Sequence, residues 1–368
     1  MSAALVLERA LPAFLAEAEL GFPEAAHSLP FPREQGFEVE VDLQTGDVFQ
    51  RAVLLEALAA IHRSGLHDLA ALIDREADYL LGRQAGDGVG GWRYFPELVE
   101  LPPDADDLAQ CIRALLAAGR ADSARRAAER PLNCYLEHGR TGPGQYRTWI
   151  VPPGDAEAVG RQLWWIERAW GQSVDCEVIA NMVVALERLD PVRHSAFLAE
   201  SRLHIHACLG ADGSWPSTWY HGPFYPGWIC SLALGPRSAA PRAWQTRLRA
   251  LQNEDGGWGL DGASDAQNTA LAIMTLGPAD PAVTPALDWL VRAQEPDGLW
   301  PGVLWIRMEL GRATGRPHTI LSYGSRLIGA GYVLQALLQI EDRMPHQKDA
   351  HRRNALARGR RDSMVACG

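Results

Sequence analysis

Three aspartates stand within four positions of the stretch LPPDADDLAQC, residues 101–111. A single aspartate ahead of a helix caps open backbone N–H groups, and the helix dipole favours acids in the first turn. One carboxylate meets that need. Three carboxylates at the end of a buried helix repel one another, which raises the proton affinity of at least one of them. Asp104, Asp106 and Asp107 therefore predict a carboxylic acid that can donate a proton into a cavity, with a plain helix cap as the competing interpretation.

A recurring turn indicates which elements position these aspartates. The stretches RQAGDGVGGW, CLGADGSW, LQNEDGGW and AQEPDGLW end at Trp92, Trp215, Trp258 and Trp300, and a degenerate copy, EHGRTGPGQY, ends at Tyr146. Successive aromatics lie 54, 69, 43 and 42 residues apart, and the longest interval holds an insertion over residues 152–170. Such a period is typical of stacked helix pairs.

Helices of two kinds flank these turns. Amphipathic helices precede them, at 68–84, 121–139, 191–210, 240–254 and 281–295, and helices that are apolar nearly all round follow them, at 107–119, 176–189, 227–235, 268–277 and 329–340. Adding residues 4–22 and 48–61 gives six outer and six inner helices. We expect an all-α fold, a double-walled (α/α)6 barrel in one domain of residues 1–340, followed by a disordered basic tail, 341–368.

The repeat residues themselves predict a structural role. Gln252 stands at a helix end, where it can hydrogen-bond backbone groups left open at the start of the next helix. Trp258 would pack flat on that glutamine side chain. We expect these residues to fasten the corners of the barrel and to take no part in chemistry.

Composition narrows the partners and the compartment. The net charge is -10, which argues against a nucleic-acid backbone as partner. The six cysteines show no CxxC spacing, which indicates a reducing compartment. The first 22 residues carry glutamates and no basic leader, and no apolar run reaches the ~20 residues that span a bilayer. We expect a cytoplasmic protein, with peripheral membrane contact still open.

The QxxDGxW turns resemble the QW repeats of the squalene–hopene cyclase and class II terpene cyclase family, from about Phe49 to Leu337. The DADD stretch matches the DxDD motif of class II cyclases and follows the first Gly-Gly-Trp turn, as in that family. The resemblance implies that Asp106 is the general acid, which protonates a terminal alkene or epoxide of a linear polyprenyl chain, and that Asp104 and Asp107 tune it.

The resemblance also points to Asn181, in the stretch SVDCEVIANMVVAL. Hopene cyclases carry a histidine there that hydrogen-bonds the acid. An amide can orient the acid but cannot relay a proton, so reprotonation would pass through water. The asparagine and the chain length favour the single-domain diterpene-type or meroterpenoid cyclases over a squalene cyclase.

Aromatic side chains would stabilise the carbocations by cation–π attraction, each by roughly 0.5–2 kcal/mol. The resemblance places such residues at Phe49, Tyr94, Trp149, Trp219 and Tyr323, and we include Tyr220 and Trp305 among the residues expected to bind substrate. Core packing is the competing interpretation for each. For an anionic head group, the stretch RMELGRATGRPH offers Arg307, Arg312 and Arg316 in a Gly-containing loop.

The DDxxD motif that ionises a diphosphate with metal is absent, so a diphosphate would be carried through unchanged. A prenyl diphosphate and a prenylated aromatic acid both remain open as substrates. No cofactor is expected, except Mg²⁺ if the substrate is a diphosphate. The sequence leaves the oligomeric state open.

Two other functions remain as alternatives. The first is a barrel that binds isoprenoids without chemistry. The second is a protein prenyltransferase β-like subunit, which would need zinc, but GGWGLDGASDAQNTA lacks the cysteine of that pattern. In the stretch HIHAC, His204 and Cys208 share one helix face while His206 lies on the opposite side, so no metal site is expected there.

Overall fold

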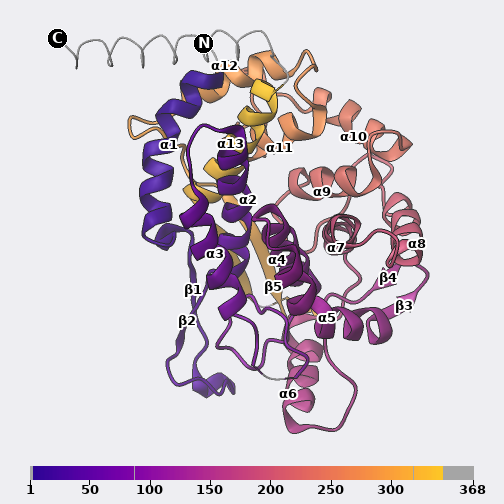
Figure 1. The fold of residues 1–368 in the computed structure, drawn as a ribbon. Coiled ribbons are helices and arrows are strands. Elements are labelled where there is room, and N and C mark those ends of the chain that lie inside the picture. Colours follow the sequence, from indigo (N-terminus) through magenta and orange to yellow (C-terminus); the bar gives the residue numbers. More distant parts are fainter. Residues whose placement is uncertain (1–2, 87, 318, 343–368) are drawn as a thin grey trace, which may run out of the picture.

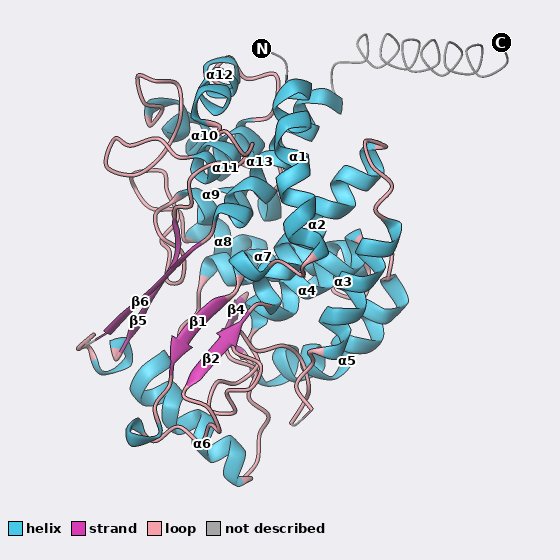
Figure 2. Ribbon diagram, turned by 90° about the vertical axis from the view of Figure 1, so that its left-hand side faces the viewer, coloured by secondary structure: helices cyan, strands magenta, loops and turns pink. Residues whose placement is uncertain are grey.

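The computed structural model describes residues 3–86, 88–317 and 319–342. All but the first two residues of the tail predicted at 341–368 lie outside the described residues. In the described part of the chain, twelve helices form two concentric walls, and three short hairpins and one further helix extend from one end (Figures 1 and 2).

The inner wall is a closed ring. Its helices are α2 (Val48–Ser64), α4 (Ala105–Ala117), α7 (Cys176–Leu189), α9 (Phe224–Leu234), α11 (Ala266–Leu276) and α13 (Arg326–Asp342). Each packs against the next in this order, and α13 packs against α2 (Figure 1). Their residues are buried on nearly every side, as the sequence predicted for helices without a polar face.

The outer wall adds one helix to each inner helix. Its members are α1 (Ala3–Glu19), α3 (Ala70–Gly82), α5 (Ala121–His138), α8 (Ser195–Ala207), α10 (Ala239–Ala250) and α12 (Val283–Ala293). Five of them pack on the inner helix that precedes them in the chain, whereas α1 packs on α13 and so joins the two ends of the described chain. The predicted (α/α)6 barrel is confirmed for the described residues.

The repeat tryptophans fasten the outer helices to the turns. The indole Nε1 of Trp258 donates to the carbonyl oxygen of Leu248 at 2.7 Å, in the last turn of α10. Gly256 in the same turn has φ +93°, and a Cβ atom there would lie 2.6 Å from the oxygen of Pro285. The turn therefore requires glycine at this position because both its backbone angle and its neighbour exclude a side chain.

The repeat glutamines connect neighbouring outer helices, but they donate to carbonyl oxygens and not to the N–H groups that a helix start leaves open. Gln252 Nε2 donates to the carbonyl oxygen of Ala282, directly before α12, at 2.8 Å. Gln294 Nε2 donates to the carbonyl oxygen of Val6 in α1 at 3.1 Å. The second bond joins the last repeat to the first helix, so the same interaction that builds the corners also closes the ring.

The additional elements gather at one end of the barrel. They are β1 (His27–Pro30) with β2 (Leu43–Gly46), β3 (Arg140–Gly142) with β4 (Gln145–Tyr146), β5 (Leu304–Leu310) with β6 (Thr319–Gly324), and α6 (Glu157–Trp165) with a π-helical turn, Ile166–Trp170. Each strand pair is antiparallel. Both views place α6 and the β1–β2 hairpin at the same end (Figures 1 and 2).

The strand β5 corrects one expectation. Residues from Arg307 onward were predicted as a loop, but Leu304–Leu310 form a strand that pairs with β6, and only Arg312–Thr314 form a short 3-10 turn. In LWIRMEL, Arg307 and Glu309 alternate with Ile306 and Met308, which is the period of a strand with one apolar face. The Gly-containing loop therefore begins after Leu310 and not at Arg307.

Candidate active site

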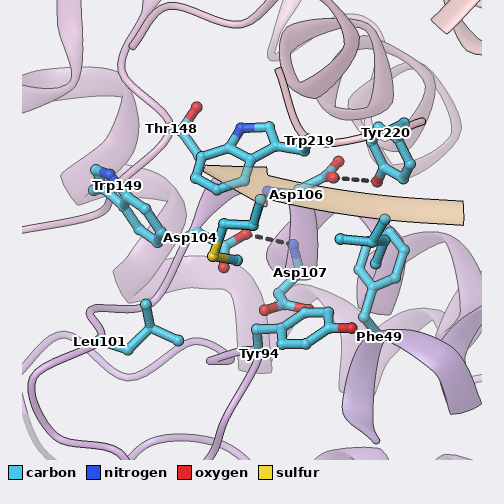
Figure 3. A pocket seen from close by; sticks show the side chains of 12 residues that line it. Phe49, Tyr94, Leu101, Asp104, Asp106, Asp107, Thr148, Trp149, Trp219 and Tyr220 are labelled. Atoms are coloured by element: carbon cyan, nitrogen blue, oxygen red, sulfur yellow. Dashed lines mark hydrogen bonds between the residues drawn. The ribbon is translucent and has the colours of Figure 1, made fainter. Parts of the chain in front are cut away.

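A cavity lies where the inner helix α4 begins. It encloses about 480 Å³ of space between atoms, its opening included, and is lined by Phe49, Tyr94, Leu101, Asp104, Asp106, Asp107, Thr148, Trp149, Trp219, Tyr220, Ile306 and Met308. These residues come from α2, from the start of α4, from three loops and from the apolar face of β5 (Figure 3). Apart from Thr148 and the three aspartates at its centre, the cavity is lined by apolar and aromatic side chains.

The first aspartate is a helix cap. Asp104 has extended backbone angles, and its Oδ1 accepts hydrogen bonds from the backbone N–H groups of Asp106 at 2.9 Å and Asp107 at 2.8 Å. This is the standard N-cap geometry, which satisfies donors that the helix leaves open. Burial raises the pKa of Asp104 to about 6. The capping interpretation therefore accounts for Asp104 and leaves two aspartates unexplained.

The second aspartate is held by two hydrogen-bond donors. Asn181 Nδ2 donates to Asp106 Oδ1 at 2.8 Å, and the Tyr220 hydroxyl donates to Asp106 Oδ2 (Figure 3). Burial raises the pKa of Asp106 to about 7, although both hydrogen bonds and a nearby arginine act in the opposite direction. Asp106 is thus a cavity-facing carboxyl that keeps a proton near neutral pH.

The third aspartate has no such support. Asp107 is 1% exposed, and neither of its carboxyl oxygens makes a hydrogen bond of ordinary geometry to a described residue. Burial, and then the charges of Asp104 and Asp106, raise its pKa well above the usual range. Both effects favour the protonated, uncharged form of Asp107 over the carboxylate.

A buried network fixes the asparagine that bonds Asp106. Arg113 Nη1 donates to Asn181 Oδ1 at 2.6 Å, which leaves the amide nitrogen of Asn181 to face the acid. Arg113 Nη2 donates to Glu56 Oε2 at 2.8 Å, and Gln110 Nε2 donates to the same oxygen at 2.9 Å. Three inner helices, α2, α4 and α7, are joined in this way directly behind the acid.

The aromatic residues predicted to bind substrate divide into two groups. The side chains of Phe49, Tyr94, Trp149, Trp219 and Tyr220 line the cavity. Trp305 lies behind them, with its ring centroid 5.6 Å from that of Phe49 and 5.7 Å from that of Tyr220. Tyr323 does not line the cavity either, and its ring stacks on His27 at 4.7 Å.

Two polar groups fix the ring of Trp219. Its Nε1 donates to Asp175 Oδ2 at 2.9 Å, and the guanidinium carbon of Arg312 lies 4.1 Å from the ring centroid. Trp149 meets the same ring edge to face at 5.5 Å. Arg312 is therefore a support for a cavity aromatic and does not itself face the cavity.

The three arginines predicted to bind a head group do not converge. Arg307 Nη1 pairs with Glu309 Oε1 at 2.5 Å. The Nε of Arg312 donates to the carbonyl oxygen of Trp170 at 3.0 Å, and Arg316 is exposed. None of the three lines the cavity. For Arg307 the strand geometry of β5 explains this position, because it directs Ile306 and Met308 to the cavity and their charged neighbours to the other face.

Comparison with known proteins gives partial sequence matches. No family model matches the chain. A squalene–hopene cyclase of Bradyrhizobium diazoefficiens is 31% identical over 194 residues, which make up 42% of this chain and 29% of that protein. A drimenyl diphosphate synthase of Streptantibioticus cattleyicolor is 31% identical over 241 residues, 60% of this chain and 40% of that protein. The chain thus matches less than half of the length of these relatives.

Comparison with solved structures covers nearly the whole chain. The type II terpene cyclase MstE of Scytonema, in complex with geranylgeranyl dihydroxybenzoate, matches 92% of this chain and 97% of its own with a TM-score of 0.68 at 16% identity. An ent-copalyl diphosphate synthase from Streptomyces platensis matches 80% of this chain and 50% of its own with a TM-score of 0.53 at 22% identity. The chain has the fold of the class II terpene cyclases.

Two observations, both restricted to the described residues of this class II cyclase fold, bear on a metal site and on a membrane span. No group of three or more histidine, cysteine, aspartate or glutamate side chains is arranged to hold a metal ion, and the nearest approach at the HIHAC stretch is His204 Nε2 to Cys208 Sγ at 3.5 Å. No helix is long and apolar enough to cross a membrane.

The class II cyclase fold also brings residues to the cavity that the sequence analysis missed. They are Leu101, Thr148, Ile306 and Met308 in the lining, and Gln50, Glu56, Arg113 and His27 behind it. One signal was available: Gln50, Glu56 and Arg113 are polar residues on helices predicted to be buried all round, and a buried charge requires a partner. His27 stands in a strand that no repeat or motif marks.

Proposed function

We propose that the chain is a class II terpene cyclase in which Asp106 protonates a terminal alkene, or its epoxide, of a linear polyprenyl substrate. The observation that carries the proposal is a half-buried, cavity-facing carboxyl with a pKa of about 7 and a hydrogen-bond donor on each oxygen. Partial sequence similarity to squalene–hopene cyclases and the shared fold support it.

The surroundings of Asp106 explain how its carboxyl is protonated before the reaction and still gives up its proton during it. Burial disfavours the carboxylate, so the proton stays on Asp106 until substrate has bound. Each carboxyl oxygen has a second lone pair, so the proton can point into the cavity while Asn181 and Tyr220 bond the first. When the proton leaves, both donors stabilise the carboxylate that forms.

The reaction is balanced without a cofactor. The Asp106 O–H bond breaks, a C–H bond forms at the terminal alkene carbon, and a tertiary cation results. The π electrons of the next double bond then close a ring, and the last cation loses a proton. Net mass is unchanged. The rings of Trp219, Trp149 and Phe49 face the space where these cations form, and each can contribute about 0.5–2 kcal/mol.

The proposal includes two classes of substrate that differ in their head group. MstE binds geranylgeranyl dihydroxybenzoate, and a partial relative is a drimenyl diphosphate synthase, so a prenylated aromatic acid and a prenyl diphosphate are both substrate classes to test. Protonation at the far end of the chain leaves either head group intact. Mg²⁺ would enter only with a diphosphate.

The test is incubation of the purified chain with farnesyl diphosphate, geranylgeranyl diphosphate, geranylgeranyl dihydroxybenzoate and squalene. At least one should give a cyclic isomer of unchanged mass, which gains one deuterium when the reaction runs in D2O because the acid exchanges its proton with solvent. Binding of a probe that is recovered unchanged would instead support the barrel that only binds isoprenoids.

A further inference from the structure

A second polar group touches the cavity apart from the three aspartates. Tyr94 lines the cavity below Asp107, with its hydroxyl directed toward Phe49 (Figure 3). That hydroxyl lies 3.0 Å from His27 Nδ1 and accepts a hydrogen bond from Gln50 Nε2 at 2.6 Å. Nothing in the protonation step uses these three side chains, although burying them without a function is costly.

The geometry of the Tyr94 oxygen leaves one position open. A phenol oxygen has one hydrogen and two lone pairs. The Gln50 amide occupies one lone pair, because an N–H group can only donate. When the hydroxyl hydrogen points to His27 Nδ1, the second lone pair is free of both partners, on a side chain that lines the cavity. An oxygen with a free lone pair and a proton acceptor behind it can receive a proton and pass its own on.

The histidine is suited to accept that proton. Burial lowers the pKa of His27 to about 4, so its ring is neutral at physiological pH and can accept. A weak base is sufficient, because a C–H bond next to a carbocation is a very strong acid. Tyr323 stacks on the ring at 4.7 Å, and Phe95 packs on it at 5.6 Å, so the ring is held in place. Its Nε2 has no hydrogen-bond partner among the described residues.

We propose that Tyr94 and His27 act together as the base that ends the cyclisation, a role that rests on the proposed function. A C–H bond next to the last cation breaks, and its electrons form the product double bond. The proton goes to Tyr94 Oη while the phenol proton moves to His27 Nδ1, so the tyrosine is unchanged and an imidazolium results. Once the product has left the cavity, the proton returns through Tyr94 Oη to water that enters there, because burial disfavours a charge on His27.

The experiment separates consumption of substrate from the identity of the product. Wild type and Tyr94→Phe are compared on whichever of the four probes above the wild type converts. Loss of the hydroxyl should lower the rate of substrate consumption much less than Asp106→Asn does, since the acid that starts the reaction is intact. The share of the wild-type alkene should fall at least tenfold, replaced by isomeric alkenes or by alcohols from capture of the cation by water. His27→Phe, which keeps a ring to stack on Tyr323, should shift the products in the same direction.

The matched control is Tyr135→Phe, which also removes a buried tyrosine hydroxyl but at a position that does not line the cavity. Its product ratio should equal that of the wild type. A purely structural role for Tyr94 predicts a slower reaction with the same product ratio. If Tyr94→Phe and His27→Phe both gave that result, the assignment of the base would be overturned, and the proposed function would stand. Turnover that survives Asp106→Asn, or no turnover by the wild type, would contradict the proposed function and the base with it.

Discussion

Two inner helices begin in nearly the same way, and only one of them meets the cavity. Asp104 before α4 and Asp265 before α11 have backbone angles of -129°, 163° and -135°, 161°. Each side chain accepts a hydrogen bond from the backbone N–H group three residues later. The backbone N–H of each also bonds the carbonyl of its repeat tryptophan, Trp92 or Trp258. The repeat therefore explains one aspartate at the start of an inner helix.

The two helix starts differ at the second and third positions after the capping aspartate. After Asp265 these positions hold Gln267 and Asn268, and no residue of this turn lines the cavity. After Asp104 they hold Asp106 and Asp107, both of which line it. Since capping is satisfied in both helices, the two additional carboxyls need another explanation. Proton donation by Asp106 supplies it, and the comparison can be tested at both helix starts.

Replacing the acid should have the largest effect. Asp106→Asn keeps the shape, and its amide can accept from Asn181 and donate to the Tyr220 hydroxyl. It cannot supply the proton, so turnover should fall by about 10²–10⁴-fold. The melting temperature near pH 6 should change little. Asp265→Asn is the matched control, because asparagine also caps helices, and its turnover should stay within about threefold. Equal losses in the two variants would mean that both aspartates act through folding.

The network behind the acid gives the next largest effect. Arg113→Met leaves Glu56 with Arg188 and Gln110 as partners and removes one charged hydrogen bond, which should lower the free energy of unfolding by about 1–3 kcal/mol. It also frees the Asn181 amide to turn, so turnover should fall by about 10–100-fold. Chemical denaturation and steady-state rates measure the two effects.

A double variant separates the two roles of this arginine. In Glu56→Leu with Arg113→Met, no buried charge is left unpaired, so most of the lost stability should return. Turnover should not return, because the amide of Asn181 still lacks the bond that orients it. Recovery of both together would show that Arg113 matters for stability alone.

The sequence predicts much of the barrel because its repeat is a local pattern. Most of the turns carry the glycine and tryptophan, and three of them also the glutamine, that their own corner needs, and each helix shows its wall by its own apolar pattern. Asp106 and Asn181 were predicted from the resemblance of two short stretches to the class II cyclase family. The structure adds their mutual contact at 2.8 Å, which joins residues on separate helices.

The residues that were missed depend on contacts between distant segments. His27 comes from a strand outside the repeats and reaches Tyr94 only because the β1–β2 hairpin folds over the end of the barrel. Arg307 was assigned to the head group from its charge, whereas strand alternation decides which side of β5 it occupies. Neither result can be obtained from composition or from a single motif.

The pH profile should show the acid directly. Turnover needs protonated Asp106, whose pKa is raised to about 7, so the rate should be level below pH 6 and fall about tenfold per unit well above pH 7. The free energy of unfolding should fall with rising pH in the same direction as the rate. The contribution of this carboxyl is fully present below about pH 4, and it is lost as the pH rises through about 7. Melting temperatures of the wild type should therefore fall more from pH 5 to 8 than those of Asp106→Asn.

A cavity aromatic should matter less than the acid. Trp219→Ala removes a ring that faces the cavity and that Asp175 and Arg312 hold in place. If the ring stabilises a cation by about 0.5–2 kcal/mol, the rate should fall by about 2–30-fold, and the mixture of products should change. Gas chromatography of the products measures both. An unaltered rate and product mixture would assign Trp219 to packing alone.

The smallest effect should come from another buried acid, and it tests whether a raised pKa is sufficient. Burial raises the pKa of Glu177 to about 8, higher than that of Asp106, yet Glu177 does not line the cavity. Its Oε1 accepts the backbone N–H of Thr218 at 2.6 Å, which holds the loop that carries Trp219. Glu177→Gln preserves that acceptor, so turnover should stay within about threefold. A loss as large as that of Asp106→Asn would show that access to the cavity does not distinguish the two acids.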